Sequence, residues 1–179
     1  MAALGWTFAN AAELGTDGRV VIAGTSAGGG LAAATTLLHR DRGGPAPAGQ
    51  LLICPMLDDR TVDVPVRPYE TWTADSNLTG WTALLGTARG GADVPAYAAP
   101  ARATDLSGLP PTFLDVGSAD IFRDEDVDYV RRIWAAGGTA DLHVWAGGYH
   151  GFDGLVPDAP ISVAARRTRI DWLRRVLAA

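Results

Sequence analysis

Four short apolar segments, each set apart by a helical pattern, limit this chain to one kind of architecture. The segments are 19–23, 50–55, 112–116 and 142–145. In the first, Val20-Val21-Ile22 is continuous rather than alternating with polar residues, which is typical of a parallel strand covered on both faces. The sequence therefore predicts an α/β fold with a mainly parallel sheet of about four strands flanked by helices.

Helical patterns lie around and between these strands. We expect helices over 3–14, 27–40, 124–136 and 162–177, with one more near 81–85. Residues 56–111 hold more glycine and proline than a packed element would tolerate, so we interpret them as an irregular insertion. With no internal repeat, residues 1–179 are predicted to form a single domain.

The composition excludes several classes of function. All 15 basic residues are arginine, so the lysine that P-loop, Schiff-base and pyridoxal-phosphate chemistry requires is absent. A net charge of −5 without a basic run makes nucleic acid an unexpected partner. The single cysteine, Cys54, lies in an apolar run and excludes an internal disulfide and a cysteine-rich metal site. We expect a buried, inert thiol, and no metal ion or cofactor.

No run of 18 uninterrupted apolar residues occurs, so no membrane span is expected. The start of the chain lacks the positively charged region of a signal peptide. An intracellular, cytoplasmic location is the resulting expectation.

A serine follows the first predicted strand, in Gly24-Thr25-Ser26-Ala27-Gly28. This G-x-S-x-G pattern between a strand and a helix is typical of a nucleophile elbow. Glycine at Gly24 and Gly28 is expected to prevent a collision across the sharp turn. The helix that starts at Ala27 points its first amides toward the same place, where the Ala27 amide would bind an oxyanion. The alternative is a glycine-rich turn with a serine cap.

A dinucleotide-binding turn is a second alternative for this segment. Gly28-x-Gly30-x-x-Ala33 fits the looser form of that fingerprint, and Asp58 could hold a ribose. Asp58 comes about ten residues later than the usual ~20 after the glycines, and the lysine of a Tyr-x-x-x-Lys pair does not exist here. The sequence therefore favours the elbow.

A nucleophilic serine needs a base, and one of the three histidines is placed for that role. His150 lies in a glycine-flanked loop after the last predicted strand, where ligands of parallel sheets bind. It could also be an ordinary exposed loop histidine. His39 is expected to meet the carbonyl end of a helix, and His143, inside a strand, to be structural.

The acid that orients the base is expected after the third predicted strand. Asp120 has that position, whereas Asp115 lies within the strand and is interpreted as structural. Asp58 and Asp59 are fallback acids. A run of acidic residues opens the next predicted helix, where carboxylates favour the helix dipole, and is interpreted as capping. The run consists of Asp124, Glu125, Asp126 and Asp128.

Several ordered motifs resemble the hormone-sensitive-lipase-like esterases, a family of the α/β-hydrolase fold. The elbow resembles the family's GTSAGG branch, and 51–59, 109–125 and 150–152 resemble its following strand, acid segment and histidine segment. The order Ser26, Asp120, His150 is also the α/β-hydrolase order. The resemblance implies a serine carboxylesterase of short-chain acyl esters, with these three residues as a triad, a small-molecule ester as substrate and no cofactor.

The resemblance covers only the C-terminal half of such an enzyme. Its N-terminal strands, cap helices and His-Gly-Gly-Gly oxyanion motif have no counterpart, and no His-Gly-Gly occurs in this sequence. The pocket should then be open and the oxyanion hole half complete. A catalytically impaired remnant that binds a ligand or partner is the alternative function. Segment 19–23 would become an exposed sheet edge, which suggests a homodimer.

Overall fold

The computed structural model describes residues 2–62 and 70–178, and its four strands form one parallel sheet. The order along the sheet follows the chain, and every neighbouring pair is parallel. The strands are β1 (Val21–Thr25), β2 (Gly49–Ile53), β3 (Thr112–Gly117) and β4 (Ala140–Trp145). The predicted α/β class and four parallel strands are confirmed. The two central strands, β2 and β3, are buried on both faces, whereas β1 and β4 at the edges are partly exposed.

Six α-helices and two short 3₁₀ turns complete the described chain. The helices are α1 (Ala2–Ala9), α2 (Ala27–Asp41), α3 (Ala74–Leu85), α4 (Arg123–Ala135), α5 (Phe152–Leu155) and α6 (Pro160–Ala178). The turns are η1 (Gly86–Ala88) and η2 (Pro100–Arg102).

Two helix boundaries differ from the sequence expectation by more than two residues. The helix predicted over 3–14 ends at Ala9, where the Asn10 side chain donates to the Trp6 carbonyl over 2.7 Å and competes with the backbone. The helix predicted at 81–85 begins earlier, at Ala74. Thr73 caps it by accepting a hydrogen bond from the Ser76 amide over 3.2 Å, a signal that apolar spacing does not contain.

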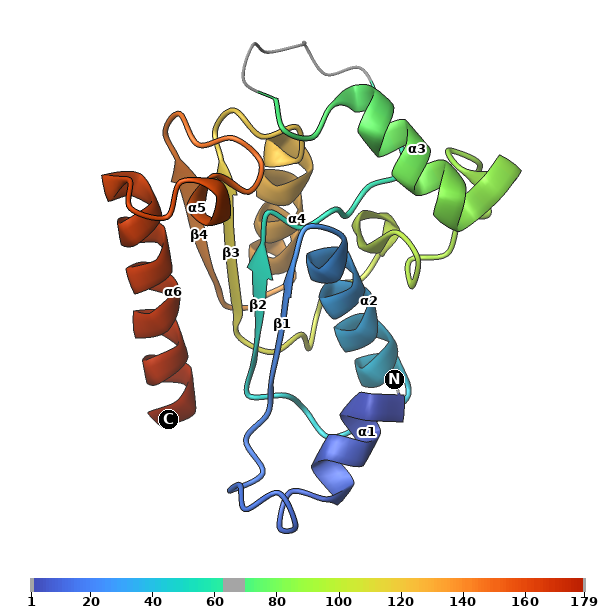
Figure 1. Ribbon diagram of the computed structural model, residues 1–179. Helices are drawn as coiled ribbons and strands as arrows, with labels where there is room; N and C mark the ends of the chain where they lie inside the picture. Colours follow the sequence, from blue (N-terminus) through green and yellow to red (C-terminus); the bar gives the residue numbers. More distant parts are fainter. Residues whose placement is uncertain (1, 63–69, 179) are drawn as a thin grey trace.

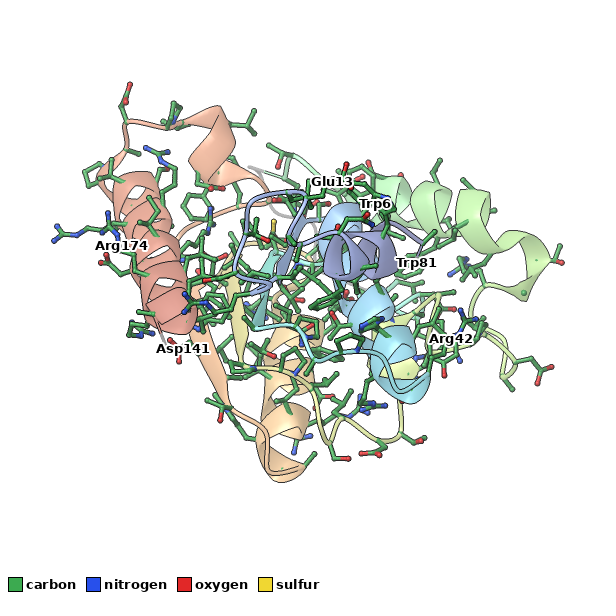
Figure 2. All side chains as sticks on the ribbon, turned by 90° about the horizontal axis from the view of Figure 1, so that it is seen from below. Trp6, Glu13, Arg42, Trp81, Asp141 and Arg174 are labelled. Carbon is green, nitrogen blue, oxygen red and sulfur yellow. The ribbon has the colours of Figure 1, made fainter. Side chains whose placement is uncertain are left out.

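The elements form three layers, with α2 and α4 on one face of the sheet and α6 on the other (Figure 1). Successive residues of a strand point to opposite faces. Leu52 and Leu114 accordingly face α2 and α4, whereas Leu51 and Phe113 pack with Trp172 of α6. The outer side of α6 carries Arg174, which in Figure 2 points away from the sheet, and it also exposes the apolar side chains of Val163, Ile170 and Leu177.

Part of the region predicted as an insertion packs at the carboxyl end of the sheet, where α3 lies (Figure 1). A separate apolar cluster joins α3 to the loops after β2 and β3. Its buried members are Met56, Trp81, Val94, Ala99, Ile121 and Phe122. Residues 63–69 of the predicted insertion lie outside the described residues.

The first strand lies at an edge of the described sheet, as expected for segment 19–23. Ala23 and Thr25 are exposed there. Pairing of two copies through this edge stays a prediction. Among the residues that the structure describes, no helix has the length and apolar character needed to cross a membrane.

Candidate active site

Ser26 occupies the single residue between β1 and α2, in a strained backbone conformation. Its φ of 57° and ψ of −122° lie in a region that costs a non-glycine residue about 1–3 kcal/mol. Three backbone hydrogen bonds hold it: the Ser26 amide donates to Ile53 over 2.9 Å, and the Ser26 carbonyl accepts from Gly30 and Met56 at 3.0 Å each. This is the geometry of a nucleophile elbow.

The glycines around the serine have different roles from those expected. A Cβ at Gly24 would lie 2.0 Å from the Gly28 carbonyl oxygen, so glycine is required there. The expectation for Gly28 is wrong, because a Cβ at that position meets nothing within 4 Å. The tight positions on the helix are Gly29 and Gly30, whose Cβ atoms would lie 2.8 Å from Pro55 and 2.2 Å from the Met56 carbonyl oxygen. Close packing against Met56 therefore explains why position 30 is glycine, so the glycine is not evidence for a bound dinucleotide.

The structure brings Ser26, His150 and Asp120 together. The Ser26 Oγ lies 2.8 Å from His150 Nε2, and His150 Nδ1 lies 2.9 Å from Asp120 Oδ2. The other oxygen of Asp120 accepts a hydrogen bond from the Phe122 amide over 3.0 Å, and this carboxylate is buried. With Nδ1 donating to a fixed carboxylate, Nε2 faces the serine as an acceptor, which is the arrangement of a serine nucleophile and its base.

Two aromatic rings and a threonine lie next to His150 and help to hold it in position. The Phe122 ring meets the imidazole edge-on at 5.2 Å, and the Trp72 ring lies 6.2 Å away. Thr71 donates from its hydroxyl to the His150 carbonyl over 2.5 Å. Sequence analysis missed Thr71, because it lies in an irregular stretch without a motif, whereas residues around Trp72 to Leu85 were expected to form a wall of the pocket.

The other two histidines do not reach the serine. His39 lies 5.6 Å from the Phe8 ring in a stacked arrangement, and its Nε2 lies 2.8 Å from the Pro45 carbonyl oxygen instead of binding a carbonyl of its own helix. His143 stacks between Phe113 and Trp145, in the structural role expected of it.

The two alternative acids, Asp58 and Asp59, each form hydrogen bonds with an arginine. Asp58 accepts from Arg60 over 2.7 Å, and the buried Asp59 accepts from Arg102 over 2.5 Å. These contacts leave Asp120 as the acid on His150. They also give Asp58 a partner other than a ribose.

Of the four acidic residues at the start of α4, two lie at the surface and two are buried. Asp124 pairs with Arg123 and Asp128 with Arg131 at the exposed side. Glu125, by contrast, is buried and accepts hydrogen bonds on Oε1 from the amides of Leu57 (2.7 Å) and Asp58 (3.1 Å).

Burial also changes the ionisation of this run. It raises the pKa of Glu125 to about 8. Asp126 is fully buried, neither side-chain oxygen has a hydrogen-bond partner among the described residues, and burial raises its pKa well above the usual value. The capping interpretation is therefore wrong for these two residues, since the helix turns them toward the interior.

A buried arginine joins three elements beneath the histidine loop. Arg169 on α6 donates from Nε to Asp115 Oδ2 over 2.8 Å and pairs with Asp153 on α5, three positions after His150 in the sequence. The Trp145 indole donates to the same Asp115 oxygen over 3.0 Å. Burial raises the pKa of Asp115, although Arg169 acts in the opposite direction. Asp115 is structural, as expected, but nothing in the sequence identified Arg169 as its partner.

Comparison with known proteins finds consistent similarities over this chain. The family model described as alpha/beta hydrolase fold matches residues 1–154. The chain is 35% identical over 169 residues to Esterase LipI of Mycobacterium tuberculosis, covering 88% of this chain and 51% of that protein. It is 35% identical over 186 residues to Carboxylesterase NlhH of the same species, covering 98% and 57%.

Similarity to solved structures agrees with the sequence comparison. A bacterial heroin esterase matches with a TM-score of 0.90 and 40% identity over 98% of this chain and 57% of its own. Esterase LipW from Mycobacterium marinum matches with a TM-score of 0.86 and 31% identity. The chain spans about half the length of the curated relatives that it matches.

Proposed function

This chain belongs to the alpha/beta hydrolase family, among its hormone-sensitive-lipase-like esterases, and from that premise we propose that it is a serine carboxylesterase. The observation that carries the proposal is the unbroken hydrogen-bond chain from Ser26 through His150 to Asp120. The relatives named carboxylesterases support the same reaction class.

In the proposed acylation, Ser26 Oγ attacks the ester carbonyl carbon while His150 Nε2, 2.8 Å away, takes the hydroxyl proton. Asp120 stabilises the imidazolium through Nδ1. The imidazolium then protonates the leaving alcohol, and an acyl-enzyme remains on Ser26. In deacylation the same imidazole activates a water molecule, which releases the acid and restores the serine.

The developing oxyanion needs donors, and this chain supplies at least one. Ala27 is the first residue of α2, and the first amides of a helix have no intrahelical partner. The Ala27 amide therefore donates to the oxyanion in the proposed mechanism, aided by the helix dipole. A loop upstream of the nucleophile provides the other donor in this architecture. Since loss of one donor costs ~10²–10³ in turnover, the isolated chain should be slow.

The proposed substrate is a small ester with a short acyl chain. Trp72 and Phe122 flank His150, and the partly exposed Trp72 would give the site an apolar wall. Ser26 follows β1 at the carboxyl end of the sheet, and α3 is a helix that packs at the same end (Figure 1).

Hydrolysis of p-nitrophenyl acetate tests the proposal. Purified protein should release p-nitrophenolate faster than Ser26→Ala at equal concentration, and Ser26→Ala should fold as the parent does by circular dichroism. Equal rates in the two proteins would overturn the esterase proposal. They would favour the alternative that the chain is a remnant that binds a ligand.

Covalent labelling tests whether Ser26 is activated as a nucleophile, whether or not the oxyanion hole is complete. An organophosphate with a p-nitrophenolate leaving group should phosphorylate Ser26, with a mass increase confined to the peptide that carries it. His150→Ala should lose most of the labelling rate, since the base is then absent. His143→Gln is the matched control, since it removes an imidazole away from the serine.

We also propose that two copies pair through the exposed β1 edge. An apolar strand with unpaired backbone groups is a template for association. Light scattering across a concentration series tests this. A dimer that weakens on substitution of the exposed Ala23→Lys supports it, and a monomer at every concentration overturns it.

A further inference from the structure

Glu125, in the first turn of α4, holds the segment after β2 through both of its side-chain oxygens. Oε1 accepts hydrogen bonds from the amides of Leu57 (2.7 Å) and Asp58 (3.1 Å), and Oε2 is hydrogen-bonded to the Thr61 hydroxyl. Glu125 is buried, so removal of its carboxyl would leave two backbone amides without an acceptor. The side chain therefore fixes the path of residues 57–61 against α4.

Thr61 connects this held segment to α3. The Asn77 side chain, on α3, donates from Nδ2 to the Thr61 carbonyl over 2.8 Å, and Asn77 is fully buried. Met56, which directly precedes the held segment, packs with Trp81 of α3 in one apolar cluster. The place of α3 at the carboxyl end of the sheet therefore depends on the segment that Glu125 holds.

α3 in turn supports Trp72, whose ring lies beside His150. A Cβ at Gly80 of α3 would lie 3.5 Å from Trp72 Cζ2, so the helix packs closely against the indole. Trp72 Nε1 is buried and has no hydrogen-bond partner among the residues that the structure describes, so the position of the ring depends on packing. The ring centres of Trp72 and His150 lie 6.2 Å apart.

We propose that Glu125 is a positioning residue that makes the chain selective for the leaving alcohol, because through Thr61 and Asn77 it sets where α3 holds Trp72. This inference rests on the proposed esterase function. His150 Nε2 protonates the alcohol oxygen in that mechanism, so the alcohol leaves beside the imidazole. Trp72 is partly exposed at the same imidazole, and its ring packs against an apolar group on that alcohol.

Glutamine at position 125 should preserve this arrangement. Burial raises the pKa of Glu125 to about 8, so its carboxyl is protonated near neutral pH. A protonated carboxyl accepts on one oxygen and donates from the other, and a glutamine amide can do the same. Glu125→Gln can therefore accept from the Leu57 and Asp58 amides and donate to the Thr61 hydroxyl. Glu125→Ala can do neither.

Fluorine NMR tests the positioning without any need for turnover. In a chain labelled with 5-fluorotryptophan, the Trp72 resonance is the one that is missing from Trp72→Phe. Glu125→Ala should shift this resonance, and Glu125→Gln should leave it in place. Gln50→Ala is the matched control, because it truncates a fully buried side chain, bonded to Thr112 over 2.8 Å, at the amino end of β2.

The fluorine spectra decide whether Glu125 acts on Trp72. An unshifted Trp72 resonance in a folded Glu125→Ala would overturn the positioning, and so would an equal shift in Gln50→Ala. If Glu125→Ala does not fold, Asn77→Ala replaces it, since this variant removes only the bond from α3 to the Thr61 carbonyl and should shift the same resonance.

The selectivity is tested by the ratio of kcat/KM for benzyl acetate to kcat/KM for methyl acetate. Both esters form the same acetyl-enzyme, so the ratio reports on the alcohol, and any loss of folded protein cancels. Glu125→Ala and Trp72→Ala should each lower the ratio by about 10-fold. Glu125→Gln and Gln50→Ala should keep the ratio of the parent. In a Trp72→Ala background, Glu125→Ala should lower the ratio by less than about twofold more.

The possible failures are distinguishable. An unchanged ratio in Glu125→Ala would overturn the selectivity, and full additivity of Glu125→Ala with Trp72→Ala would show that Glu125 does not act through that ring. If the parent hydrolyses neither ester, the proposed function fails and the selectivity fails with it, whereas the fluorine spectra still decide the positioning.

Discussion

Arg169 Nε lies 2.8 Å from Asp115 Oδ2, which fastens the last helix to the strand that leads to Asp120. Asp115 lies on β3 and the two residues are 54 positions apart in the sequence. The same guanidinium pairs with Asp153, in the short helix after His150. One buried cation thus connects the segments that carry the base and the acid.

Arg169→Ala should lower the free energy of unfolding by about 3–5 kcal/mol, because Asp115 is left as an uncompensated buried carboxylate. Arg167→Ala is the matched control on the same helix, since its contact with Asp171 is exposed and 3.8 Å long. That variant should lose less than about 1 kcal/mol. Urea unfolding followed by tryptophan fluorescence measures both. Equal losses of stability in the two variants would show that the buried pair of Arg169 and Asp115 stabilises the fold no more than the exposed pair does.

Glu125→Gln should change how stability depends on pH. Burial raises the pKa of Glu125 to about 8 from its usual value of 4.5, so between these values the folded chain holds a proton that the unfolded chain releases. The free energy of unfolding therefore falls as pH rises through this window. Glutamine keeps the acceptor for the Leu57 and Asp58 amides but cannot ionise.

The free energy of unfolding of Glu125→Gln relative to that of the parent should increase by about 3 kcal/mol from about pH 5 to about pH 8. Urea unfolding at the two pH values measures it. Asp126 is present in both proteins, but Glu125 helps to raise the pKa of Asp126, so the difference reports Glu125 together with its effect on this neighbour. A gain that is the same at both pH values would contradict the prediction.

Gly24→Ala and Gly28→Ala should have opposite outcomes. The new methyl at position 24 would lie 2.0 Å from the Gly28 carbonyl oxygen, so the turn must move and Ser26 must leave its position opposite His150. At position 28 the methyl meets nothing, and alanine favours a helix by about 0.5–1 kcal/mol over glycine. Thermal unfolding and organophosphate labelling of Ser26 compare the two. Loss of labelling in Gly28→Ala would show that this position touches the reaction.

Asp120→Asn should reduce ester turnover by roughly 10²–10⁴, because an amide does not hold the imidazole tautomer or stabilise its charged form. Asp59→Asn is the control, since Asp59 is a buried carboxylate paired with Arg102 away from the triad. That variant should lose stability but keep its turnover per folded molecule. The opposite result would move the role of the acid to Asp59.

The sequence by itself determined the architecture of this protein. Continuous apolar runs can be buried only with cover on both faces, which requires a parallel sheet between helices. The positions of Ser26, Asp120 and His150 follow from the same rule, because each comes directly after a strand and these ends meet at one edge. That reasoning uses only local pattern and chain order.

Only the tertiary structure decided which side chains meet across the core. The segment after β2 decides that Gly29 and Gly30 are crowded while Gly28 is not. The rotation of α4 against the same segment decides whether Glu125 is a surface cap or a buried acceptor. The nearness of Cys54 to Asp120 and His150 depends likewise on strand register. Contacts between residues far apart in the chain are set by packing geometry, which residue type and spacing do not encode locally.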